Sequence, residues 1–172
     1  MRASVVETER LILRGYTPSD FPHAVEIWAH PDVVRYVSGR ASTAEETWAR
    51  LLRNAGLWAL LGYGYWAVEE KNSGRFIGDV GFGDFKRDMT PSIAGIPEIG
   101  WVLAPQAHGK GYATEAARAA LAWGETQWGA QPTVCIIDPG NTPSLRVAEK
   151  VGYREITRSV FKDHDVIVFQ RG

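Results

Sequence analysis

A glycine-spaced turn between an apolar strand and an alanine-rich helix is the part of the sequence best suited to chemistry. Gln106, Gly109 and Gly111 lie between the apolar run 98–103 and the helix expected from residue 113. Glycine lets the backbone adopt positive φ and come close to a ligand. The first N–H groups of a helix have no partner inside the helix, and the helix dipole is positive at that end. The turn therefore predicts a site for a phosphate group.

Two commoner phosphate-binding motifs do not fit this turn. A nucleotide-binding P-loop requires Ser or Thr directly after its lysine, whereas Lys110 is followed by Gly111. A dinucleotide-binding turn requires a small residue three places after its second glycine and an acid about 20 residues further on. This chain has Thr114 and Gln131 at those places. On spacing alone, a turn whose glycines only relieve crowding is an equally good interpretation.

A second strand and a second capped helix follow along the chain. Residues 133–137 form a short β-rich run, and residues 141–152 have the pattern of one short helix. Asn141 or Thr142 provides the N-cap of that helix, and Gly152 ends it. The order along the chain is therefore strand, glycine turn, helix, strand and capped helix.

This order and its motifs resemble the GNAT superfamily of acetyl-CoA-dependent N-acetyltransferases. The Gln-x-x-Gly-x-Gly of residues 106–111 is similar to the acetyl-CoA signature of that superfamily. The run Thr-Glu-Arg-Leu-Ile-Leu-Arg at residues 8–14 resembles the opening of the RimJ/RimL-like branch, named for ribosomal-protein N-terminal acetyltransferases. Further matches to this branch are Ile77-Gly78, Glu98-Ile99-Gly100, Asn141-x-x-Ser144 and Gly152-Tyr153. The resemblance spans nearly the whole chain. It implies an α/β (α+β) fold whose mixed, mostly antiparallel central sheet is flanked by helices, with splayed fourth and fifth strands.

The resemblance also implies where acetyl-CoA binds. The pantetheine arm would enter between the splayed strands beside backbone groups of Val102 and Leu103, and a backbone N–H would serve the oxyanion. Backbone N–H groups of residues 107–113 would hold the pyrophosphate. Lys110 either adds charge toward the phosphates or is an ordinary solvated lysine. The expected cofactor-binding residues are Trp101, Val102, Leu103, Gln106, Ala107, His108, Gly109, Lys110, Gly111, Tyr112, Ala113, Thr114, Asn141 and Ser144.

The expected catalytic residues are Ser144 and Glu98. Many members of the superfamily place a tyrosine seven residues after the asparagine as the general acid, but this chain has Ala148 there. We therefore expect Ser144, or an ordered water, to protonate the leaving thiolate. The alternative is that Ser144 only satisfies N–H groups in its helix turn. Glu98 is the leading candidate for the base, with Asp79 or a water chain as alternatives. A purely structural hydrogen bond is the other interpretation of Glu98.

The composition is that of a soluble globular protein, and we expect one domain over residues 1–172. Hydrophobic residues make up 45% and charged residues 23%. The net charge of −1 offers no basic patch for nucleic acid. No run approaches the roughly 18 apolar residues of a membrane span, and no apolar signal region opens the chain, so we expect a cytoplasmic protein. Four scattered histidines and the single Cys135 predict neither a metal site nor a disulfide.

Periodicity predicts the other elements. Helices are expected at 20–37, 43–61 and 113–128, and strands at 10–16, 65–70, 75–85 and, as a pair, 155–171. Thr43 and Glu46 form a capping-box pattern. Trp58, Tyr63, Trp101 and Tyr36 either pack in the core, which is the simpler interpretation, or line an acceptor groove.

We expect a metal-free enzyme in which an amine attacks acetyl-CoA directly in a ternary complex. The acceptor would be a protein N-terminus or a small-molecule amine such as an amino acid, a polyamine or a drug amine. An α-amine demands less of a base than a lysine, because its ordinary pKa is about 8 rather than about 10.4. A homodimer is compatible with the sequence. The alternative is a non-catalytic acyl-CoA-binding sensor on the same fold, which the missing tyrosine keeps open.

Overall fold

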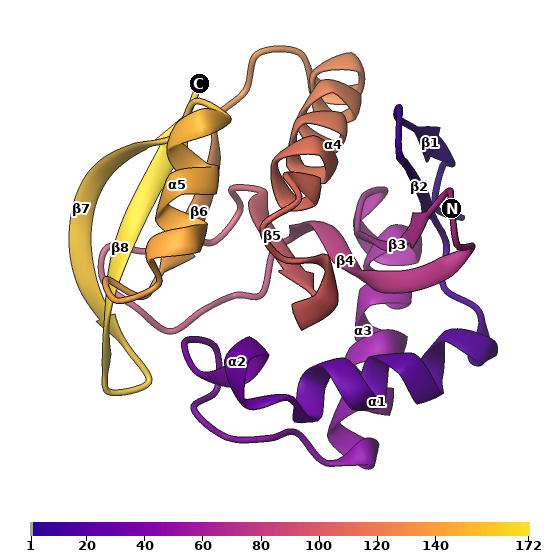
Figure 1. Ribbon diagram of the computed structural model, residues 1–172. Coiled ribbons are helices and arrows are strands. Elements are labelled where there is room, and N and C mark those ends of the chain that lie inside the picture. Colours follow the sequence, from indigo (N-terminus) through magenta and orange to yellow (C-terminus); the bar gives the residue numbers. More distant parts are fainter. Residues whose placement is uncertain (1) are drawn as a thin grey trace.

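A mixed sheet of eight strands runs through the protein, whose computed structural model describes residues 2–172 (Figure 1). The order across the sheet is β1-β2-β3-β4-β5-β6-β8-β7. Neighbouring strands are antiparallel except β5 and β6, which are parallel. The strands are β1 (Val6–Glu7), β2 (Leu11–Arg14), β3 (Tyr65–Glu70), β4 (Arg75–Gly83), β5 (Glu98–Leu103), β6 (Thr133–Ile137), β7 (Arg154–Phe161) and β8 (His164–Arg171). The predicted mixed, mostly antiparallel sheet is confirmed.

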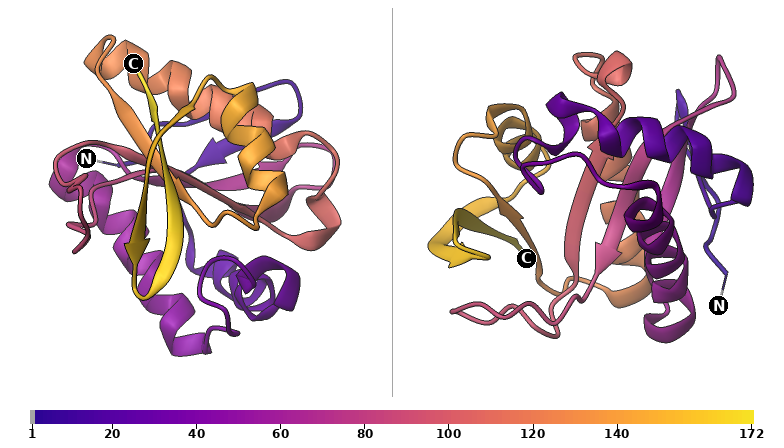
Figure 2. Two further views of the ribbon diagram at one scale, coloured as in Figure 1. Left: turned by 90° about the vertical axis from the view of Figure 1, so that its left-hand side faces the viewer. Right: turned by 90° about the horizontal axis from the view of Figure 1, so that it is seen from below.

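Helices cover both faces of this sheet. The helices are α1 (Phe21–Ala29), α2 (Pro31–Val34), α3 (Ala44–Leu61), α4 (Tyr112–Trp128) and α5 (Thr142–Lys150), with short 3-10 turns at Pro18–Asp20 and Pro105–Ala107. Helices α4 and α5 lie on one side, and α1, α2 and α3 lie on the other (Figure 2). These two sides are called the α4 face and the α3 face below.

The helix boundaries follow from local chemistry. Thr43 Oγ1 accepts a hydrogen bond from Glu46 N at 3.1 Å and Glu46 Oε2 accepts one from Thr43 N at 2.9 Å, which confirms the predicted capping box at the start of α3. Gly62 ends α3 with φ of 76°. The expectation of one continuous helix over 20–37 is wrong. His30 is extended because the residue before Pro31 avoids the helical region, and the segment divides into α1 and α2 there.

The core on the α4 face explains how α4 comes close to the sheet. Ala116, Ala117 and Ala120 have no exposed surface and pack against residues of β4 and β5. Small side chains allow this close approach. Trp58 is buried and lies edge-on to Trp66 at a centroid distance of 4.8 Å, so it serves the core rather than an acceptor groove.

The sheet opens between β5 and β6. The two strands share a single paired position, Glu98 with Val134, and then separate. These are the fourth and fifth strands of the predicted fold, because the short β1 adds one strand before them. Gly100, Trp101 and Val102 are half-buried beyond the last pair. The predicted splay is present and leaves an edge of β5 open to a ligand.

Candidate active site

The glycine turn delivers an uncapped helix end to the open edge of β5. Gly109 has φ of 73° and Gly111, the N-cap of α4, has φ of 78°, both in the left-handed region that favours glycine. No side chain caps α4 within residues 2–172. The N–H groups of Tyr112, Ala113 and Thr114 in the first turn are therefore free of a side-chain cap, as an anion site requires.

The N-terminal segment fastens this turn in place. Glu115, in the first turn of α4, accepts hydrogen bonds from Thr8 Oγ1 at 2.7 Å, Arg10 N at 2.9 Å and Arg10 Nε at 2.7 Å. Arg10 Nη1 also donates to Lys110 O at 2.8 Å. Burial alone would raise the pKa of Glu115, but the donors from Thr8 and Arg10 hold it below its usual range. The segment that suggested the RimJ/RimL-like branch thus holds the turn and neutralises Glu115 in the first turn of α4.

Backbone N–H and C=O groups of successive β5 residues point alternately toward β4 and toward the open edge. The Val102 carbonyl lies 2.1 Å from the position that a Cβ on Gly78 would occupy, so this carbonyl points toward β4. That orientation differs from the expected contact of the Val102 backbone with the pantetheine arm, because alternate residues of a strand direct their polar groups to opposite edges. Leu103 O points away from β4 and accepts a hydrogen bond from His108 Nε2 at 2.8 Å. The open edge is thus formed by Trp101 and Leu103, and His108 ties it to the glycine turn.

A tryptophan and a serine connect β5 to α5 across the opening. Trp101 Nε1 donates a hydrogen bond to Ser144 Oγ at 3.3 Å. Asn141 Oδ1 accepts from Ser144 N at 3.3 Å and so caps α5, as predicted. Because the indole N–H can only donate, Ser144 accepts from Trp101 and keeps its own hydroxyl hydrogen for another acceptor.

On the α3 face, two glycines make room for a tyrosine. Gly81 of β4 and Gly100 of β5 lie opposite each other, and Tyr65 of β3 pairs with Gly81. A Cβ on Gly100 would lie 2.3 Å from Tyr65 Oη, so only glycine admits this phenol over β5. Burial raises the pKa of Tyr65 above its usual range, and Glu98 adds to that shift. Within residues 2–172 the Tyr65 hydroxyl has no hydrogen-bond partner.

Glu98 is held by an arginine that the sequence did not suggest. Arg87 Nε donates to Glu98 Oε2 and Arg87 Nη2 to Oε1, each at 2.8 Å. The Glu98 side chain is only 7% exposed. Each carboxylate oxygen has a further acceptor position, so a water or an amine can still reach it. Because side chains alternate along a strand, Glu98, Gly100 and Val102 face α3, whereas Trp101 and Ser144 belong to the α4 face. The structure therefore does not bring Glu98 and Ser144 together.

Asp79 lies on β4, one strand away from the open edge of β5, in a buried polar cluster. Tyr16 Oη donates to Asp79 Oδ1 at 2.6 Å, and Asn54 Nδ2 donates to Tyr16 Oη at 3.2 Å. Burial raises the pKa of Asp79 from its ordinary value of 3.8 to about 6, and the Tyr16 hydrogen bond opposes that rise.

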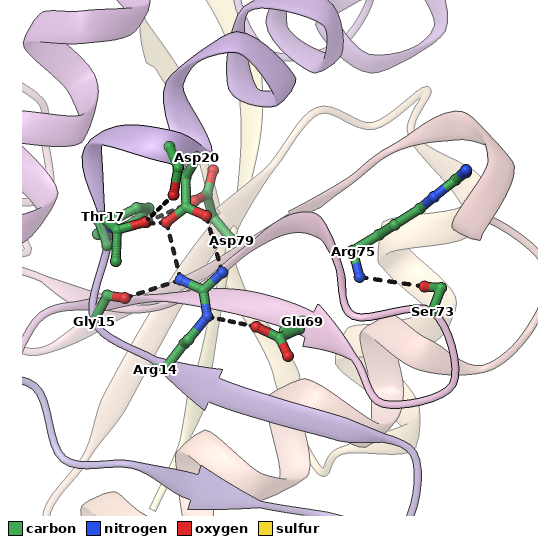
Figure 3. Close-up of polar contacts among 10 residues, drawn as sticks. Arg14, Gly15, Thr17, Asp20, Glu69, Ser73, Arg75 and Asp79 are labelled. Carbon is green, nitrogen blue, oxygen red and sulfur yellow. Dashed lines mark hydrogen bonds and ion pairs between the residues drawn. The ribbon is translucent and has the colours of Figure 1, made fainter.

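A neighbouring ion cluster positions the entrance to α1. Arg14 of β2 donates to both oxygens of Asp20 at 2.9 Å and to Glu69 Oε2 at 2.7 Å, and Asp20 Oδ2 accepts from Thr17 N (Figure 3). These bonds join β2, β3 and the 3-10 turn before α1. The cluster is thus a structural support beside Asp79.

Cys135 lies inside the core. Cys135 is 2% exposed, and burial raises the pKa of its thiol above its usual range. In the part of the chain that is described, no group of three or more His, Cys, Asp or Glu side chains is arranged to hold a metal ion. None of the helices in residues 2–172 combines the length and apolarity needed to cross a bilayer.

Comparison with known proteins agrees with this geometry. The acetyltransferase (GNAT) domain family matches residues 10–154. The N-acetyltransferase YnaD of Bacillus subtilis is 30% identical over 149 residues, which is 87% of this chain and 82% of that protein. A GnaT-family acetyltransferase from Bordetella pertussis superposes with a TM-score of 0.87 and 29% identity, over 99% of this chain and all of that one.

The predicted branch is also represented among the similar structures. RimL, the ribosomal L7/L12 alpha-N-protein acetyltransferase in complex with coenzyme A, has a TM-score of 0.77 over 98% of this chain and 97% of its own. At 17% identity this likeness shows the shared fold alone. The chain is a member of the GNAT family, and it is an acetyl-CoA-dependent acetyltransferase.

Proposed function

We propose that the protein transfers the acetyl group of acetyl-CoA to a primary amine by direct attack in a ternary complex. The observation that carries this proposal is the meeting of three features at one place. These are the uncapped end of α4, the open edge of β5 and the Ser144 hydroxyl across it. Residues 1–172 would act as one catalytic domain. The cofactor would approach from the α4 face and the amine from the α3 face.

The residues around the turn fit the phosphates of coenzyme A. The first N–H groups of α4 supply an anion site, and Gly109 has no atom within 4 Å of where a Cβ would stand, so the backbone can be approached closely. Lys110 lies in the same turn and adds positive charge, while Arg10 offsets the charge of Glu115 beside it. When bound, acetyl-CoA supplies an activated thioester. Trp101 and Leu103 would border its arm, and a β5 N–H would donate to the oxyanion.

Ser144 would steady and protonate the leaving thiolate. Its hydroxyl accepts from Trp101 Nε1 and retains a hydrogen to donate. Asn141 provides the cap of α5, so the Ser144 side chain is not needed for capping. This division of roles favours the catalytic interpretation of Ser144 over the purely structural one. It also accounts for catalysis with Ala148 at the place of the usual tyrosine.

Glu98 would accept the proton of the amine, directly or through one water. Arg87 keeps the carboxylate fixed beside the open part of β5 and leaves acceptor positions free. Asp79 is the weaker candidate because it lies on β4, opposite Val102 and one strand away from the open edge of β5. An α-amine, with an ordinary pKa near 8, would need less assistance than a lysine.

This function can be tested by measuring the release of coenzyme A in the presence of a panel of amines. The panel contains N-terminal peptides, free amino acids, a polyamine and an aminoglycoside, each with acetyl-CoA. We expect at least one class to release coenzyme A well above the amine-free rate, together with an N-acetyl product in the mass spectrum. Tight acetyl-CoA binding without release for every amine would instead favour the acyl-CoA sensor. Cytoplasmic location and a homodimer remain predictions from the sequence.

A further inference from the structure

Two arginines of α3 lie over the acceptor side without a carboxylate partner. Among residues 2–172, Arg87 on this face pairs with Glu98, but neither Arg50 nor Arg53 forms an ion pair. The Arg53 guanidinium has only the amide oxygen of Asn54 at 3.3–3.4 Å. The Arg50 guanidinium has Ser42 Oγ at 3.4 Å and stacks 3.5 Å from the Trp28 ring centroid.

The Phe85 ring links Arg53 to the Arg87–Glu98 pair. Arg53 Cζ lies 4.8 Å from the Phe85 ring centroid. Arg87, which donates to Glu98, has its Cζ 4.9 Å from the same centroid. Phe85 covers Gly83, directly opposite Glu98, and its ring lies 6.2 Å from that of Tyr65. A continuous surface therefore runs from Arg53 over Phe85 and Tyr65 to Gly100.

The charges on this surface do not balance. Arg87 and Glu98 neutralise each other, and the buried Asp79 is opposed at longer range by Arg50. Arg53, which is exposed, is left as an uncompensated cation at the edge of the surface. A guanidinium without a partner is suited to binding a carboxylate through paired N–H donors, and it repels a polycation.

We propose that the acceptor is an amine that also carries a carboxylate, which Arg53 binds with Arg50 in support. The amine then lies over Tyr65 and Gly100, near Glu98, and its apolar part rests on Phe85. Two sources share this chemistry, a free α-amino acid and a peptide with an acidic residue near its N-terminus. The acetylation of this amine rests on the proposed function, whereas the binding of the carboxylate does not.

The test measures binding to protein saturated with coenzyme A, so it does not depend on turnover. One pair of probes is the dipeptide amide of methionine and glutamate and its counterpart with glutamine, which differ only in the side-chain charge. The second pair is free methionine and its methyl ester. We expect the acid of at least one pair to bind about tenfold more tightly than its neutral partner, as expected for a charge-assisted hydrogen bond. The pair that shows the preference identifies the source.

Two variants test whether the preference for the acidic probe comes from Arg53 of α3. Arg53→Gln is expected to remove about tenfold of the affinity for the acid and to leave the neutral probe within about twofold. The control Arg75→Gln changes an exposed arginine at the start of β4, whose side chain points away from the cluster around Asp79 (Figure 3). It should change neither probe. Affinity for acetyl-CoA and the melting temperature should be the same in both variants.

Three outcomes would overturn the inference: equal affinity for acid and neutral probe in both pairs, an equal loss for both probes in Arg53→Gln, or a loss of acetyl-CoA affinity in that variant. The first two leave the proposed acetyl transfer intact if coenzyme A is still released. Tight binding of the acid with no release would instead refute the proposed function and keep the carboxylate site. The two failures are therefore distinguishable.

Discussion

The turn before α4 is built from backbone, whereas the α3 face of the sheet is built from side chains. At the turn, two glycines at positive φ and the first N–H groups of α4 form the proposed phosphate site. On the α3 face, Tyr65, Phe85, Arg53 and Glu98 come from four separate segments of the chain. Backbone recognition tolerates change in most side chains but not in the glycines. Side-chain recognition can be altered one residue at a time, which suits the proposed selection of the acceptor on the α3 face.

The largest effect is expected at the backbone-built site. Gly111→Asp places a carboxylate and a Cβ where the phosphates would bind, and we expect acetyl-CoA affinity to fall at least about 100-fold in titration calorimetry. Gly62→Asp is the matched control, because Gly62 has φ of 76° and ψ of 3°, against 78° and 9° at Gly111, with no atom within 4 Å of a Cβ. It carries the same backbone strain at the other end of α4, where the neighbouring Tyr63 packs on Trp128. Near-normal affinity in Gly111→Asp would remove the phosphates from this turn.

Ser144 is expected to show the next largest effect, and on turnover rather than affinity. Ser144→Ala should lower kcat by about 100-fold, the lower end for a general acid, with little change in acetyl-CoA affinity. The N-cap of α5 is retained, because Asn141 accepts from the backbone N–H of residue 144. Trp101→Phe, which removes the indole N–H donor and part of the ring system, should cost less. A fall in kcat below about threefold would return Ser144 to a purely structural role.

The pH dependence of the rate of a Glu98 variant tests the role of the α3 face in catalysis. Glu98→Gln keeps the shape and one acceptor for Arg87 but removes the charge. We expect a rate deficit of about tenfold at low pH, where the amine is protonated and needs a base. The deficit should shrink as pH rises, near pH 8 for an α-amine and nearer pH 10 for a lysine or polyamine. Dividing each rate by the fraction of folded enzyme at the same pH removes any contribution from lost stability. A profile parallel to wild type would exclude Glu98 from the proton path.

Asp79 should have the smallest effect on the rate and a measurable one on stability. Because its pKa rises from 3.8 to about 6 on folding, the native state binds the proton more tightly than the unfolded chain. The contribution of Asp79 to the free energy of unfolding therefore falls as pH rises through that window, by about 3 kcal/mol in total. Denaturant unfolding should show wild type losing about this much relative to Asp79→Asn between pH 4 and pH 7. Turnover of the variant should stay within about threefold of wild type. Parallel stability curves would contradict the assignment, and a large loss of rate would make Asp79 the base.

The turn before α4 could be predicted from the sequence more fully than the α3 face, because one depends on local signals and the other on strand register. Glycine spacing and helix caps are local, so the turn at Gly109 and Gly111, the α3 capping box and the Asn141 cap could all be predicted. The Arg87–Glu98 pair and the position of Tyr65 over Gly100 depend on strand register, which a single sequence does not reveal. The break at His30 was missed although Pro31 signalled it. The role of the Thr8–Arg10 segment required the contact with Glu115, more than 100 residues away.

The central claim is that the cofactor and the amine meet at the opening beside β5, from opposite faces, before any bond changes. Initial-velocity measurements at varied acetyl-CoA and amine concentrations test it most directly. Attack in a ternary complex predicts double-reciprocal lines that intersect, since both substrates must be bound together. Parallel lines would indicate an acetylated enzyme intermediate and a separate visit by the amine. With Cys135 buried and its thiol pKa raised, we expect intersecting lines. Parallel lines would contradict this account of the site.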